Sequence, residues 1–246
     1  SQILIDILSH IVEFRNGESG QHVQHIKMLT GFLLDRLMQK TDKYDLKWSD
    51  QYMITIASAL HDIGKVGIDE KILNKPGRLT DEEFKIMKSH SEIGASMIRD
   101  MDFPQDKPLV RTAWEICRWH HERWDGRGYP DGLKGEEIPI SAQIVSIADV
   151  YDAMTSARVY RGALCPFEVI DTMYKDAFTK FEPEYILPFL KNVASSYINN
   201  DVRLSDGRIG KVVLINENAL SLPIVQCEDE FIDLSKTRGL TVSAIL

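Results

Sequence analysis

The sequence predicts a mainly α-helical bundle of about seven or eight helices, followed by a small C-terminal β module. Up to residue 200 the apolar residues recur every three or four positions, which places them on one face of a helix. Beyond residue 200 the pattern changes to short β-branched runs separated by Asn, Asp and Gly turn signals. We therefore predict a helical domain over residues 1–200 and a β-rich module over residues 201–246.

The helices are predicted from apolar periodicity together with residues that begin or end a helix. Thr80 and Glu83 form a capping box, and four prolines stand where a helix would begin. Asn16-Gly17 is expected to end the first helix, and Gly64 fits a C-terminal cap of the third. The predicted helices cover residues 3–15, 19–40, 49–61, 80–97, 108–120 and 139–151, and two more begin at Pro166 and Pro183.

The C-terminal module is predicted to contain four or five strands. Asp206-Gly207 and the segment 216–218 are typical turn sequences, and the residues between them are rich in Val and Ile. The runs that we expect to form strands are residues 209–215, 223–226, 231–234 and 240–246.

Composition excludes some classes of function. A net charge of −8 argues against a protein that wraps long nucleic acid. No apolar run approaches the roughly 18–20 residues that a membrane span requires. Three widely spaced cysteines, without a CxxC motif, indicate a reducing cytoplasm. Because the sequence starts at Ser1 inside a helical pattern, we interpret it as a fragment that lacks an N-terminal sensory or regulatory part.

Two stretches carry more functional groups than folding requires. Residues 120–132, HHERWDGRGYPDG, combine two adjacent histidines with a loop of three glycines. Such a loop has little side-chain volume for a core, and its length and polarity favour a site. The second stretch is His61-Asp62-Ile63-Gly64-Lys65, where an imidazole and a carboxylate close a helical run.

Several helices end in imidazole or carboxylate groups, which is what a metal site in a helical bundle requires. Each residue also has a structural alternative: a histidine can be a hydrogen-bonded core residue, Asp149 can pair with Arg158, and Glu18 can favour a helix N-terminus. Together, however, these groups predict a metal cluster. The candidates are Glu18, His22, His61, Asp62, His90, His120, His121 and Asp149.

The donor types narrow the choice of metal. Imidazole and carboxylate without thiolate favour Fe, Mn, Zn or Ni over an iron–sulfur cluster. More than four protein ligands exceed a single tetrahedral zinc, so two or three metals are expected. Such a centre can hold a phosphoryl group and supply hydroxide at neutral pH.

At this point the chain resembles the HD-GYP domain, a subgroup of the HD phosphohydrolases. The resemblance covers about residues 10–190 and rests on four motifs. These are His61 to Lys65, Lys75 to Thr80, His120 to Pro130 with its Gly128-Tyr129-Pro130 triplet, and Ala148 to Ala153.

The resemblance implies a phosphodiesterase that hydrolyses cyclic di-GMP to linear pGpG, and in some members on to GMP. It implies iron or manganese as cofactor. His61, Asp62, His90, His120, His121 and Asp149 match the core ligands, and Glu18 with His22 matches the additional pair of members that hold three metals. Because Glu18 is present, a trinuclear site is favoured over a binuclear one.

The resemblance also implies roles in the reaction. Asp62 would bridge metals that hold an attacking hydroxide, and Lys65 would donate to a phosphoryl oxygen. Arg158 and Arg161 would bind phosphates, and Tyr129 would lie at the mouth of the substrate site. Many members carry Lys at the position of Arg161.

Smaller roles are expected around the ligands. His25 stands where the family commonly has Arg, and we expect it to support the site rather than to bind metal. Asp152 is expected to orient a ligating histidine. Glu122, Arg123 and Asp125 are expected to hold the glycine loop in shape.

Three alternatives remain open at the level of sequence. The enzyme could prefer cyclic GMP-AMP, the chain could be a non-catalytic cyclic-dinucleotide receptor, or it could act on mononucleotides as a generic HD nucleotidase. The complete ligand set with Lys65 argues against a receptor, and the GYP loop argues against a nucleotidase. The apolar face of the first helix could form a homodimer or pack on its own domain.

Overall fold

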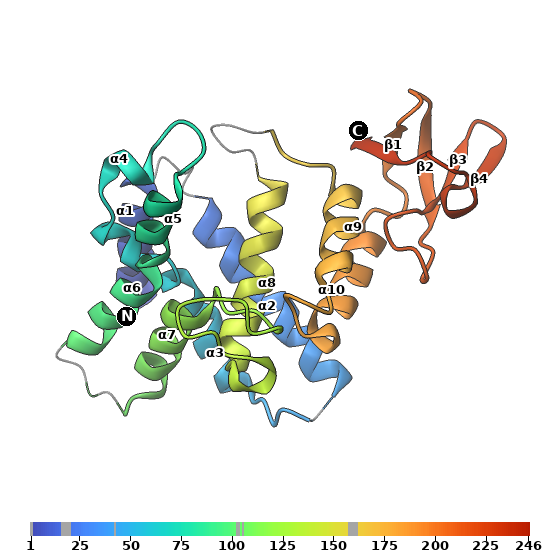
Figure 1. Cartoon of the computed structure of the whole chain (residues 1–246). Coiled ribbons are helices and arrows are strands. Elements are labelled where there is room, and N and C mark those ends of the chain that lie inside the picture. Colours follow the sequence, from blue (N-terminus) through green and yellow to red (C-terminus); the bar gives the residue numbers. More distant parts are fainter. Residues whose placement is uncertain (1, 16–20, 42, 102–103, 105, 157–161) are drawn as a thin grey trace.

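The computed structural model describes residues 2–15, 21–41, 43–101, 104, 106–156 and 162–246 (Figure 1). These residues form a helical part followed by a five-stranded sheet, as the sequence predicts. The helices are α1 (Gln2–Arg15), α2 (His22–Lys40), α3 (Trp48–Ala57), α4 (Glu70–Leu73), α5 (Asp81–Lys88), α6 (His90–Asp100), α7 (Pro108–Trp119), α8 (Ile140–Thr155), α9 (Pro166–Asp176) and α10 (Pro183–Ser196).

Helix α8 is central to the helical part, and α2, α7 and α9 pack against it (Figure 1). Its apolar positions Ile144, Ile147 and Ala148 are fully buried, in agreement with the predicted inward face. Helix α7 also packs on α3 and α6, which brings the C-terminal end of α7 close to the N-terminal end of α6. This arrangement places the ends of several helices around one point.

Local capping chemistry fixes most helix starts where the sequence predicts them. Thr80 Oγ1 accepts a hydrogen bond from the Glu83 amide, and the Glu83 carboxylate accepts one from the Thr80 amide. Proline occupies the first turn of α7, α9 and α10, while Pro139 is the N-cap of α8. These interactions stay within four residues, so they are readable from sequence.

The helix predicted over residues 80–97 is divided in two at Ser89. The Ser89 hydroxyl and the His90 ring both donate to carbonyl groups of the last turn of α5, those of Ile86 and Met87. Side chains that compete for backbone acceptors in this way interrupt a helix. Together with the single turn α4, this division explains why more helices are found than expected.

Gly64 does not cap a helix, contrary to the prediction. It lies inside a 3-10 helix, Ile63–Gly67, which packs against α6. A Cβ atom at this position would stand 1.9 Å from the His90 carbonyl oxygen and 2.4 Å from the Gly94 nitrogen. Glycine is therefore required because the two backbones approach each other, not because the helix ends. The third helix likewise stops at Ala57 and continues to Leu60 as a 3-10 turn.

The C-terminal sheet is antiparallel throughout, with the strand order β4-β3-β2-β1-β5. The valines 202, 212 and 225 are buried on its inner face. The strand β1 was not predicted, since it has only four residues and directly follows the last helical turn. The strands are β1 (Asp201–Leu204), β2 (Ile209–Leu214), β3 (Ile224–Cys227), β4 (Glu230–Asp233) and β5 (Val242–Ile245).

Secondary structure changes type at residue 201, and β5 contacts α9. Division of the chain into domains 1–200 and 201–246 stays a prediction. Among the helices of the described ranges, none combines the length and the apolar character that crossing a bilayer demands.

Candidate metal centre

Of the eight ligands predicted from sequence, the seven that the structure describes come together in two adjacent groups. The first comprises Asp62, His90, His120 and His121, and the second comprises His22, His61 and Asp149. Within each group one ligand atom of every residue lies within 4.8 Å of the others. His22 and His90 begin α2 and α6, and His120 and His121 follow the last residue of α7. The segment after α3 contributes His61 and Asp62, and the interior of α8 contributes Asp149.

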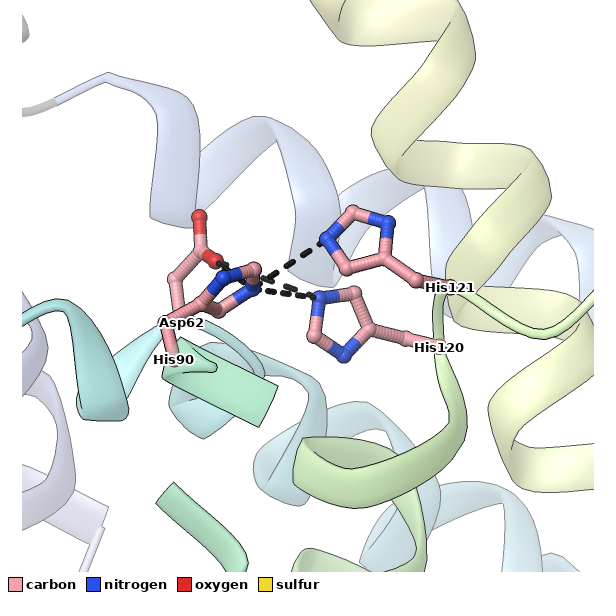
Figure 2. A group of neighbouring side chains, drawn as sticks. All are labelled: Asp62, His90, His120 and His121. Carbon is pink, nitrogen blue, oxygen red and sulfur yellow. Dashed lines mark hydrogen bonds and ion pairs between the residues drawn. The ribbon is translucent and has the colours of Figure 1, made fainter. Parts of the chain in front are cut away.

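In the first group, the rings and the carboxylate converge on one point (Figure 2). His90 Nε2 lies 3.3 Å from Asp62 Oδ1, 3.5 Å from His120 Nε2 and 3.2 Å from His121 Nε2. His120 Nε2 lies 3.9 Å from the same Asp62 oxygen. His90 and His120 are buried, so water cannot freely solvate these nitrogens.

In the second group, two histidines face one carboxylate. His22 Nε2 and His61 Nε2 lie 3.7 and 3.8 Å from Asp149 Oδ1 and 3.4 Å from each other. Asp62 links the two groups, because its Oδ2 atom lies 3.3 Å from His61 Nε2 while Oδ1 faces His90. A carboxylate between two clusters of nitrogens is suited to bridging two cations.

Backbone carbonyl groups orient three of the rings. The Nδ1 atoms of His61, His90 and His120 lie 2.9, 2.7 and 2.8 Å from the carbonyl oxygens of Ser58, Met87 and Ile116. Nδ1 must therefore carry the proton, and in the neutral ring Nε2 keeps its lone pair. The Nε2 atoms of His90 and His120 lie 3.5 Å apart, and a cation bound by both of their lone pairs satisfies this geometry. The donor set thus fits divalent metals.

The electrostatics of the protein alone agree with this arrangement. Burial, together with the nearby His61 and His90 rings, lowers the pKa of His120 to about 3. Burial lowers the pKa of His121 as well, so both rings are neutral ligands at neutral pH. Burial by itself would lower the pKa of His61. The negative charges of Asp62 and Asp149 outweigh this effect, and the pKa is raised to about 9. Without a metal, the carboxylates therefore retain a proton at His61.

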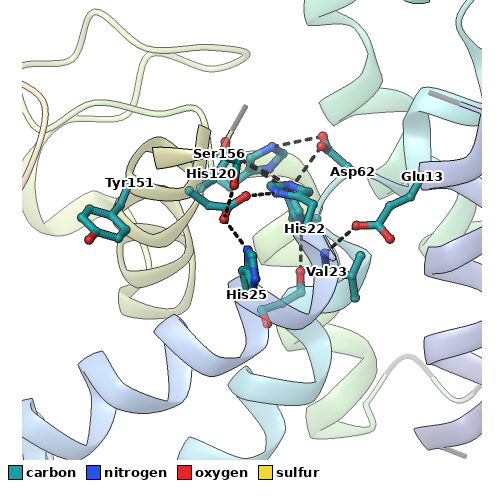
Figure 3. Close-up of polar contacts among 12 residues, drawn as sticks. Glu13, His22, Val23, His25, Asp62, His120, Tyr151 and Ser156 are labelled. Atoms are coloured by element: carbon teal, nitrogen blue, oxygen red, sulfur yellow. Dashed lines mark hydrogen bonds and ion pairs between the residues drawn. The ribbon is translucent and has the colours of Figure 1, made fainter. Parts of the chain in front are cut away.

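Asp152 contacts Nδ1 of His22, whose Nε2 atom faces Asp149, and so orients this ring as expected from the sequence. Its Oδ2 atom lies 2.6 Å from His22 Nδ1, and its Oδ1 atom lies 2.8 Å from His25 Nδ1 and 3.0 Å from the Ser156 hydroxyl (Figure 3). Asp152 is buried on α8, so this network ties α8 to the first turn of α2. His25 contacts the supporting carboxylate rather than either group.

Sequence reasoning overlooked Glu13. This buried residue of α1 accepts a hydrogen bond from the Val23 amide at the start of α2 (Figure 3). It also lines a small cavity of about 10 Å³ together with His22, His61 and Asp62. The available signal was a carboxylate among apolar residues of an amphipathic helix, the same signal that singled out Asp149.

Lys65 and Tyr129 lie beside the centre. Lys65 Nζ is 2.6 Å from Asp62 Oδ2, and this ammonium group is the largest favourable cause of the low pKa of Asp62, which burial by itself would raise. The Tyr129 ring stacks on His121 with a centroid distance of 4.7 Å. Burial raises the pKa of the Tyr129 hydroxyl, so it remains protonated and available as a donor.

Buried and paired carboxylates hold the glycine loop in place. Glu122 accepts hydrogen bonds from the amides of Asp131 and Gly132, and Arg123 forms an ion pair with Asp125 at 2.9 Å. Asp131 in turn binds the Arg118 guanidinium through both of its oxygens. Three predicted site residues, Glu18, Arg158 and Arg161, lie outside the described residues.

The helical fold and the histidine–aspartate centre define the class of this protein. The sequence matches the HD domain family over residues 3–185, and the chain belongs to that family. It is 38% identical over 190 residues to a cyclic di-GMP phosphodiesterase of Thermotoga maritima, an alignment that covers 76% of this chain and 48% of the relative. It is also 38% identical over 186 residues to 3'3'-cGAMP-specific phosphodiesterase 2 of Vibrio cholerae, covering 76% of this chain and 34% of that protein. These relatives confirm the HD-GYP resemblance.

A solved structure agrees with the fold. The crystal structure of a cyclic GMP-AMP specific phosphodiesterase of Vibrio cholerae aligns with a TM-score of 0.54 at 15% identity, over 75% of this chain and 46% of that one. The chain spans less than half the length of each of these curated relatives.

Proposed function

We propose that the chain hydrolyses a phosphodiester bond of a cyclic dinucleotide, with cyclic di-GMP as the preferred substrate. The observation that carries the proposal is the pair of histidine–aspartate groups joined by Asp62. Divalent metals bound there would neutralise phosphoryl oxygens and make water a stronger nucleophile. Relatives that carry the name of cyclic di-GMP phosphodiesterase support the choice of substrate.

Different residues would bind the metals, stabilise the developing charge and contact the substrate. The neutral rings of His90, His120 and His121 supply nitrogen ligands, and Asp62 supplies one oxygen to each group. Lys65 lies against Asp62, where its ammonium group can donate to a nonbridging phosphoryl oxygen as negative charge develops. Tyr129 covers the outer side of His121 and offers a ring face and a hydroxyl to the substrate.

We infer iron or manganese as the metals, because the HD-GYP resemblance implies them and the imidazole and carboxylate donors of the two groups suit them. The number of metals depends on Glu18, which would add a carboxylate next to His22. With Glu18 as a ligand we expect three metals per chain, and without it two. Linear pGpG is the expected product, and its further cleavage to GMP is part of the proposal.

A second candidate is a phosphodiesterase that prefers 3'3'-cGAMP. It is favoured by the similarity to a Vibrio cholerae enzyme of that name, which matches this chain as well as the cyclic di-GMP enzymes do. The two substrates differ only in one base, so the metal centre serves either, and contacts to the base decide the preference.

The test is to measure metal content and cyclic dinucleotide turnover on the same anaerobically purified sample. We expect two or three irons or manganeses per chain and conversion of cyclic di-GMP to pGpG. Asp62→Asn should lower both metal content and turnover, the latter at least about a hundredfold. Asp100→Asn, which changes an exposed carboxylate at the end of α6, serves as the control and should alter neither.

Two results would overturn the proposal. A full metal complement with binding but no cleavage of any cyclic dinucleotide would identify a receptor. Hydrolysis of mononucleotides in place of cyclic dinucleotides would identify a generic HD nucleotidase.

A further inference from the structure

Lys88 is the last residue of α5 and lies near the centre without belonging to it. Its ammonium nitrogen is 5.4 Å from the centroid of the Phe84 ring and 5.7 Å from that of the Tyr129 ring. The side chain is half-buried, and two aromatic rings therefore hold its charge in a defined place.

The position of Lys88 is tied to the metal centre in two ways. Tyr129 stacks on His121 at 4.7 Å, so the two centroid distances limit the separation of the Lys88 nitrogen from the His121 ring to about 10 Å. His90, two residues after Lys88, begins α6, and its ring donates a hydrogen bond to the carbonyl group of Met87. The backbone around Lys88 is thus fixed by a predicted metal ligand.

The charge of Lys88 is uncompensated among the described residues. No carboxylate of the described ranges lies within ion-pair distance of its nitrogen, whereas Lys75, in the turn that precedes α5, pairs with Glu83 of that helix at 2.6 Å. A cation held by aromatic rings beside an anion-binding centre attracts further negative charge.

We propose that Lys88 binds the second phosphate of the cyclic dinucleotide, the one that is not cleaved. This inference rests on the proposed function. The substrate carries two phosphodiester groups in one ring, and the metal centre accounts for one of them. The other lies a short distance away in the same molecule. Arg158 and Arg161, which the sequence predicts to bind phosphates, lie outside the described residues, and among the described ones Lys88 offers a cation on the side of the centre formed by Tyr129.

The test compares two substrates in manganese-loaded protein. Cyclic di-GMP has two phosphates, whereas bis(p-nitrophenyl) phosphate has a single phosphodiester and no second phosphate to bind. We expect Lys88→Met to raise KM for cyclic di-GMP about tenfold with little change in kcat, which corresponds to roughly 1.4 kcal/mol. Hydrolysis of bis(p-nitrophenyl) phosphate and the metal content should remain unchanged.

Two further variants complete the design. Lys88→Arg keeps the charge and should restore most of the affinity. Lys85→Met removes an exposed lysine one turn earlier on α5 and should leave KM unchanged. An equal loss with both substrates, or an unchanged KM for cyclic di-GMP, would overturn the inference.

Failure of the proposed function gives a different signature. If the chain is a nucleotidase that does not bind cyclic di-GMP, the inference falls together with the proposed function, and if it is a receptor, the unaltered protein binds cyclic di-GMP without cleaving it. The dissociation constant, measured by calorimetry, then replaces KM: a tenfold weakening in Lys88→Met supports the inference, and an unchanged constant overturns it.

Discussion

The 3-10 helix Ile63–Gly67 can pack against α6 only because Gly64 has no Cβ atom. A Cβ atom there would meet the backbone of His90 and Gly94 at 1.9 and 2.4 Å, and backbone cannot move aside as a flexible side chain can. We expect Gly64→Ala to lower the free energy of unfolding by about 3 kcal/mol, measured by urea denaturation. Gly31→Ala is the control, because its Cβ would meet only the Thr55 side chain at 3.6 Å. That control should be neutral or stabilising by up to about 1 kcal/mol, and equal losses in both variants would contradict the prediction.

Asp131 provides a pH-dependent contribution to stability. Its carboxylate accepts hydrogen bonds at 2.7 Å from the Arg118 guanidinium and from the Trp119 indole, and chiefly the Arg118 contact lowers its pKa. The folded-state pKa is thus below the unfolded value of about 3.9, so the stabilisation is complete above that pH and is lost as pH falls through the folded-state pKa.

We therefore expect Asp131→Asn to lower the free energy of unfolding by about 1 kcal/mol at pH 7. The difference from the unaltered chain should shrink below about pH 4 and vanish once both states bind the proton. Denaturant titrations at a series of pH values measure this. A difference that stays constant down to pH 2 would show that the carboxylate charge is not responsible.

At the scale of elements, α2 and α8 are joined through one buried carboxylate. Asp152 binds the Nδ1 atoms of His22 and His25, so it sets which nitrogen of His22 faces Asp149. We expect Asp152→Asn to weaken metal binding in the group formed by His22, His61 and Asp149 about ten- to a hundredfold. Elemental analysis after dialysis against a graded chelator series measures the loss. Asp171→Asn, which removes a half-exposed carboxylate of α9, should leave metal retention unchanged.

Elements were predictable where the deciding interactions are local. The Thr80 capping box and the proline at the start of α7 act within one turn, so sequence fixes both helix starts. The break at Ser89 also rests on local contacts, those of Ser89 and His90 with the carbonyl groups of Ile86 and Met87, but the apolar periodicity continues through it and therefore predicted one helix. The role of Gly64 was missed for a different reason, since its close neighbours His90 and Gly94 are distant in sequence.

At the scale of the molecule, metal binding should contribute to stability. The folded chain holds the imidazole rings and carboxylates of the two groups close together, an arrangement that the unfolded chain does not have. A metal present at a hundred times its dissociation constant adds about 2.7 kcal/mol. We therefore expect chelation to lower the melting temperature in calorimetry by several degrees. His90→Ala removes the ring that contacts both His120 and His121. The melting temperature of this variant should therefore fall less when the chelator is added. An identical chelator effect in both proteins would locate the metal elsewhere.

The assembled centre follows from sequence only in part. The residue types predicted a cluster, yet nothing in the spacing between His61 and His120 says that their rings meet at a centroid distance of 5.2 Å. The packing of α3, α6 and α7 brings them together, and the motif resemblance anticipated that result. The predicted roles of the ligands, of Lys65 and of Tyr129 stay predictions until metal and substrate are measured.

The imidazole rings of the centre are oriented either by backbone carbonyl groups or by a side chain, and this difference has an evolutionary consequence. His61, His90 and His120 are aimed by main-chain oxygen atoms, which every amino acid possesses, so substitutions at Ser58, Met87 or Ile116 leave those acceptors in place. His22 is aimed by the side chain of Asp152, which one nucleotide change in its codon can remove. Mutation can therefore adjust the occupancy of one half of the centre while the other half is inherited almost unchanged. A binuclear and a trinuclear descendant of this fold would then be separated by very few steps.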